Sequence, residues 1–175
     1  VPGTALTLTM DGDEGALLQA EADLALDVFG LVSGTGHFGF KKASANFVLT
    51  DGTTSTALTA AKYLAMGGHV NSAFVGAGAV GLTLTNVDFG IVLVVDPGAN
   101  PAVTTDDINY SAITASVGSA SFAGITGLVA TVTNATLAIN QTSASGSNKV
   151  LDFVNTSGHA DDDTAASFAV PGTAL

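Results

Sequence analysis

Residues 20–28 read AEADLALDV, and their side chains alternate between apolar and polar at every position except Ala25. Alternation of this kind places one set of side chains on each side of a pleated strand. The same period continues in 87–95, where Val87, Phe89, Ile91, Leu93 and Val95 share one face, and in 6–10. Further strands are expected at 37–50, 70–76, 110–122, 127–140 and 149–155.

Two segments, 13–22 and 56–66, contain good helix formers, but the alternation runs on beyond the first of them, and packing overrides propensity. Both are assigned to strands. Turn chemistry separates the expected strands at several points: Asp51-Gly52, Gly67-Gly68, Asp96-Pro97-Gly98, Asn100-Pro101 and Ser145-Gly146-Ser147.

The predicted fold is all-β. Alanine and glycine far outnumber aromatic residues, and small side chains suit extended, closely stacked sheets better than a thick core. We therefore expect an elongated, mainly antiparallel sheet, sandwich-like or solenoid-like, that is able to continue between neighbouring units.

The hexapeptide Val1-Pro2-Gly3-Thr4-Ala5-Leu6 recurs unchanged as Val170-Pro171-Gly172-Thr173-Ala174-Leu175, so the two copies start 169 residues apart. A repeat at fixed spacing is typical of modular arrays. Residues 1–175 are interpreted as one β-rich unit of a tandem array with a period of 169 residues. The alternative is a duplicated tag or linker, since Val-Pro-Gly also occurs in elastin-like designs.

The net charge is −11, from 15 acidic residues against four lysines. A surface of this sign repels phosphate, so nucleic-acid partners are not expected. The absence of cysteine excludes disulfides and zinc–thiolate sites. No apolar run reaches the roughly 20 residues of a membrane helix, and no signal peptide is visible, so any export signal would lie elsewhere in a parent chain.

Three segments occur in a suggestive order between about residues 24 and 140: Phe38-Gly39-Phe40-Lys41-Lys42, then Leu49-Thr50-Asp51-Gly52, then Asn71-Ser72-Ala73-Phe74-Val75-Gly76. This order resembles the repeats of giant bacterial cell-surface or secreted proteins of the adhesin-like type. The acidic insertion that follows Phe-Val-Gly in such repeats is replaced here by Ala77-Gly78-Ala79-Val80. The resemblance implies an extracellular or cell-surface location, a bacterial host and a structural or adhesive role, with no catalytic residues to carry over.

The three histidines, His37, His69 and His159, give no support for catalysis. No Gly-x-Ser-x-Gly elbow accompanies them, and no pair has the spacing of zinc ligands. His37 is placed in a strand and His69 after a Gly-Gly turn, both as surface residues. A sugar-cleaving site is also poorly supported, because the chain has no Trp and two Tyr. We expect no enzyme activity.

Calcium is the one cofactor that the sequence suggests. Carboxylates occur at alternate positions of a glycine-containing loop and cluster again before the second hexapeptide, and calcium takes 6–8 oxygen ligands in flexible geometry. Acidic turns can equally be simply solvated. The candidate ligands are Asp11, Asp13, Glu14, Asp161, Asp162 and Asp163.

These observations favour a structural repeat that associates with neighbouring copies in a fibre, sheath or surface stalk. The alternative is an adhesin-type binding module that recognises a glycan or a host surface through loops such as 100–107.

Overall fold

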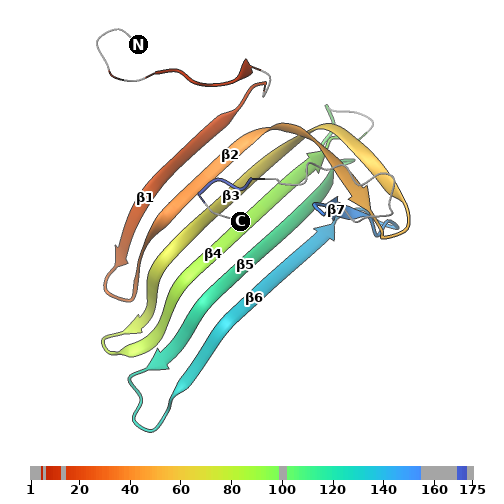
Figure 1. Ribbon diagram of the computed structural model, residues 1–175. Coiled ribbons are helices and arrows are strands. Elements are labelled where there is room, and N and C mark those ends of the chain that lie inside the picture. Colours follow the sequence, from red (N-terminus) through yellow and green to blue (C-terminus); the bar gives the residue numbers. More distant parts are fainter. Residues whose placement is uncertain (1–4, 6, 13–14, 99–101, 155–168, 173–175) are drawn as a thin grey trace.

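The computed structural model describes residues 5, 7–12, 15–98, 102–154 and 169–172. Six long strands follow one another as neighbours in a single antiparallel sheet (Figure 1). They are β1 (Leu18–Val28), β2 (Val32–Thr50), β3 (Ser55–Ala77), β4 (Val80–Asp96), β5 (Ile108–Ala123) and β6 (Ala130–Thr142), and a short β7 (Val150–Asp152) pairs with β2. The predicted all-β, antiparallel fold is confirmed, and the sheet is open rather than closed.

The register separates the side chains of β1–β6 into two faces, because cross-strand partners point to the same side of a sheet. The apolar face, as we call it, has large side chains in its central rows. Its three middle rows are Leu24-Gly36-Val70-Val87-Val117-Ala135, Ala22-Phe38-Gly68-Phe89-Ala115-Leu137 and Ala20-Phe40-Met66-Ile91-Ile113-Ile139.

The other side, the mixed face, carries every acidic side chain of β1–β6. These are Glu21, Asp23, Asp27, Asp88 and Asp96. The only charged side chains of β1–β6 on the apolar face are those of Lys42 and Lys62, both near one end of the sheet. Charge is therefore distributed very unevenly between the two sides.

The buried core lies at one end of the mixed face. Strands β2 and β3 extend past their neighbours and bend toward β7, as Figure 1 shows. A register shift next to Asn46 accompanies the bend, and the Asn46 side chain accepts a hydrogen bond from the Ala60 N–H at 2.9 Å. The cluster beneath the bend contains Ala43, Phe47, Leu49, Ala61, Tyr63, Ala65, Val92, Val94, Tyr110, Leu151 and Val170.

Most of the strand predictions are confirmed. The segment 56–66 lies within β3, whereas of the described part of 13–22 only the residues from Leu18 onward are strand. The turn at Asp51-Gly52 is also confirmed: Asp51 accepts hydrogen bonds from the N–H groups of Thr53 and Thr54 at 2.9 and 2.7 Å.

Two predictions are wrong. Residues 7–10 lie outside any strand, because nothing in the described chain pairs with them, and Leu6 lies outside the described residues. Gly67-Gly68 is not a turn but lies within β3, where a Cβ on Gly68 would come within 3 Å of the rings of Phe38 and Phe89. Glycine is therefore required by packing at position 68.

Candidate functional site

Three glycines form a bare strip across the mixed face. Gly39 of β2 pairs with Gly67 of β3, which in turn pairs with Gly90 of β4. Because none of them has a side chain, the backbone of three adjacent strands is open to close approach at this point. We call this feature the glycine strip.

The segment Ala169–Gly172 lies on the glycine strip. A Cβ on Gly39 would be 2.7 Å from the Pro171 Cβ, and one on Gly90 would be 3.3 Å from a Val170 methyl. Val170 and Pro171 are buried there. Gly172 has φ of +77°, and a Cβ on it would be 2.5 Å from the Gly39 nitrogen. Gly39 and Gly172 therefore leave no room for a side chain, and at Gly90 a side chain would be a tight fit.

A row of acids and histidines runs beside the strip. Asp23, His37, His69 and Asp88 are successive cross-strand partners on β1 to β4. The Asp23 carboxylate accepts a hydrogen bond from His37 Nδ1 at 2.9 Å, and the Asp88 carboxylate accepts one from His69 Nδ1 at 2.7 Å. Since each histidine pairs with an acid on the adjacent strand, the row ties β1 to β2 and β3 to β4.

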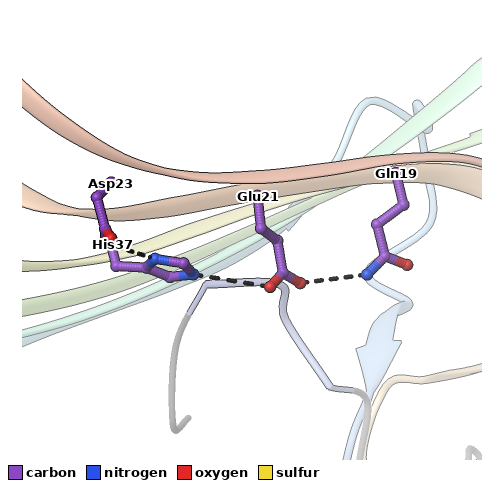
Figure 2. Close-up of polar contacts among 4 residues, drawn as sticks. All are labelled: Gln19, Glu21, Asp23 and His37. Atoms are coloured by element: carbon purple, nitrogen blue, oxygen red, sulfur yellow. Dashed lines mark hydrogen bonds and ion pairs between the residues drawn. The ribbon is translucent and has the colours of Figure 1, made fainter. Parts of the chain in front are cut away.

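His37 lies between two carboxylates, as Figure 2 shows. Its Nε2 is 3.6 Å from Oε2 of Glu21. The other carboxylate oxygen of Glu21, Oε1, accepts a hydrogen bond from the Gln19 side-chain amide at 3.2 Å. The hydrogen bond to Asp23 raises the pKa of His37 above its ordinary value of 6.5; desolvation opposes this rise, and the charges of Asp23 and Glu21 add to it. The acid–histidine row therefore favours the imidazolium form of His37.

An NMR titration of the His37 ring should give a pKa above 6.5, and Asp23→Asn should lower it toward that value. The Asp23–His37 pair stabilises the fold fully at pH values below the unfolded-state pKa of His37. This stabilisation is lost as the pH rises through the higher pKa that His37 has in the folded state. Asp27→Asn, on the same strand and face, is the matched control. Equal His37 titration curves for the wild type and Asp23→Asn would contradict this assignment.

The segment Ala169–Gly172 and side chains of the acid–histidine row line a shallow groove of about 580 Å³. One wall is the segment, and the other carries charged, amide and imidazole groups. They are formed by Gln19, Glu21, His37, Lys41, His69, Asp88, Ala169, Val170, Pro171 and Gly172.

The structure leaves the calcium prediction open. Of its six candidate ligands only Asp11 lies in the described chain, in an exposed position, while Asp13, Glu14, Asp161, Asp162 and Asp163 fall outside it. Within the described residues no group of three or more acidic, histidine or cysteine side chains is arranged to hold a metal ion.

The histidine predictions have mixed outcomes. His37 lies in a strand as expected, but His69 lies in the middle of β3 rather than after a turn, because Gly67-Gly68 continues that strand. His159 falls outside the described residues. The expectation that the protein is not an enzyme stays a prediction.

Sequence reasoning missed the glycine strip. A signal was present at Gly39 and Gly90, since each is a single glycine within a run that otherwise reads as strand, and such a glycine often marks a close backbone approach. The identity of the approaching segment depends on contacts between residues more than 70 positions apart, which periodicity does not encode.

Searches of protein-family models, curated proteins and solved structures give no match to this chain. Within the described residues no helix combines the length and the apolar character that a bilayer crossing requires.

Proposed function

We propose that this chain is a structural module that associates with copies of itself, as one repeat of a large secreted or cell-surface protein that forms a fibre, sheath or stalk. The observation that carries the proposal is the apolar face of the six-stranded sheet, which nothing in the described chain covers. The cell-surface location is supported by the resemblance to adhesin-like repeats and by the cysteine-free composition.

The apolar face is large for a monomer. Leu24 on β1 is 49% exposed and Leu137 on β6 is 50% exposed, and partly exposed aromatic and branched side chains fill the strands between them. Strands spaced ~4.8 Å apart, with a rise of ~3.4 Å per residue, give six strands of this length a face of roughly 1,000 Å². The largest apolar patch on a typical monomer is about 300–600 Å².

A second copy of the chain is the occupant that fits this face best. Two such faces packed together would bury roughly 2,000 Å², within the range of permanent homodimers. All acidic side chains of β1–β6 would then point away from the interface, so the net charge of −11 does not oppose the contact there. Two sheets packed in this way would form a sandwich with layers ~10 Å apart.

The sheet can also continue sideways. Strands β1 and β6 are the two edges of the path β1–β6. This path has six strands, each antiparallel to its neighbours, so β6 of one copy runs antiparallel to β1 of a copy placed beside it. Pairing of this head-to-tail kind does not close and generates filaments.

Charge placed on the apolar face should prevent assembly. We expect Leu137→Glu and Leu24→Glu each to raise the dissociation constant of the assembly at least tenfold, because a charge buried without a partner strongly opposes association. Sedimentation velocity over a range of concentrations measures this.

Thr136→Glu and Ala25→Glu are the matched controls, since they add the same charge at the neighbouring, exposed position of the same strand but on the mixed face. They should assemble like the wild type. A wild-type chain that stays monomeric at every concentration, or equal effects of both pairs of variants, would overturn the proposal.

A further inference from the structure

We infer that the glycine strip is a binding site for the Val-Pro-Gly segment of a second copy, the copy's own residues 1–3. The strip is seen occupied by Val170-Pro171-Gly172 of the same chain, and the same three residues stand at positions 1–3 in an identical hexapeptide. This inference deepens the proposed function, on which it rests, by naming a contact that would join successive copies.

Each residue of the segment meets a separate physical demand. The valine side chain is buried next to Gly90, and the proline lies against Gly39 at a distance that no side chain on Gly39 would allow. The third residue needs a positive φ and has no room for a Cβ. A segment with Val, Pro and Gly in this order satisfies all three demands, and residues 1–3 have that order.

The way in which the segment is held also favours exchange between copies. Val170-Pro171-Gly172 adds no strand to the sheet and is held by side-chain burial and close backbone contact. A second copy can therefore supply the same contacts without unpairing any strand of β1–β6. In a tandem array of period 169, these six residues would be the end of one unit and the start of the next, so the strip would fix each unit to its successor.

The test uses the full chain with its own segment weakened by Val170→Asp, labelled with ¹⁵N and titrated with the synthetic peptide Val-Pro-Gly-Thr-Ala-Leu. We expect the amide resonances of Gly39, Gly67 and Gly90 to shift on Val170→Asp and to move back toward their wild-type positions as the peptide is added. Val170→Ala, a milder change, serves as a second host if Val170→Asp does not fold.

Two controls make the result specific. A scrambled peptide of the same composition should leave the three resonances unmoved, and Gly39→Val in the same host should weaken peptide binding at least tenfold. No movement with the native peptide in a folded host, or equal movement with the scrambled one, would overturn the inference. Because peptide binding is read on single chains, its failure is distinguishable from a failure of self-association through the apolar face.

Discussion

Phe47→Ala is expected to lower the free energy of unfolding by about 3–5 kcal/mol, the usual range when a fully buried phenylalanine is truncated. Phe47 is 1% exposed and packs edge-on against Tyr63 with ring centroids 5.7 Å apart. The buried cluster is confined to one end of the sheet, so few other side chains can fill the cavity. Urea-induced unfolding, monitored by circular dichroism, measures the change.

The matched control is Phe29→Ala. Phe29 lies in the turn between β1 and β2 and is 94% exposed, so its loss should change stability by no more than about 0.5 kcal/mol. A Phe47→Ala protein as stable as Phe29→Ala would show that the bent ends of β2 and β3 do not form the main core.

Gly39→Val should release the Val-Pro-Gly segment and lower the free energy of unfolding by about 2–4 kcal/mol. A Cβ at this position would lie 2.8 Å from the backbone of both Pro171 and Gly172, and backbone atoms cannot move aside as a flexible side chain can. The segment must therefore leave, which exposes the buried Val170 side chain, a group whose burial contributes about 1.5–3 kcal/mol. Proline contacts and strain account for the remainder.

Unfolding curves and the loss of nuclear Overhauser contacts between the Val170 methyls and β4 would report the change together. Gly12→Ala is the control, because Gly12 has nothing within 4 Å of its Cβ position. If Gly39→Val retained the Val170 contacts at wild-type stability, the glycine strip would not be the binding site of the segment.

Much of β1 and the part of β4 over residues 87–95 could be predicted from sequence because the two-residue period there is a local signal. Leu24, for example, lies on the same face as Ala22 and Leu26, as the two-residue period requires. Gly67-Gly68 was misassigned because a glycine pair has the same local chemistry whether it forms a turn or makes room in a strand. Which of the two applies is decided by Phe38 and Phe89, whose rings lie against Gly68 and which are more distant along the chain.

The candidate site could be predicted only in part. The duplicated hexapeptide was visible in the sequence, but the site that binds its second copy was not. The alignment of Gly39, Gly67 and Gly90 depends on the registers of three strands. That His37 and His69 are cross-strand partners could not be predicted for the same reason. The two residues are 32 positions apart, and only the β2–β3 register places them opposite each other.

The central claim is that the apolar face is covered by a second copy. The chain has no cysteine, so a single introduced cysteine can carry a spin label without further changes. Leu84→Cys and Thr83→Cys place labels on adjacent residues of β4, the first on the apolar face and the second on the mixed face.

The measurement is the accessibility of each spin label to a water-soluble paramagnetic relaxation agent, recorded by electron paramagnetic resonance over a range of protein concentrations. The account predicts that the label at position 84 becomes protected as concentration rises while the label at position 83 stays accessible. Equal accessibility of the two labels at every concentration would contradict it.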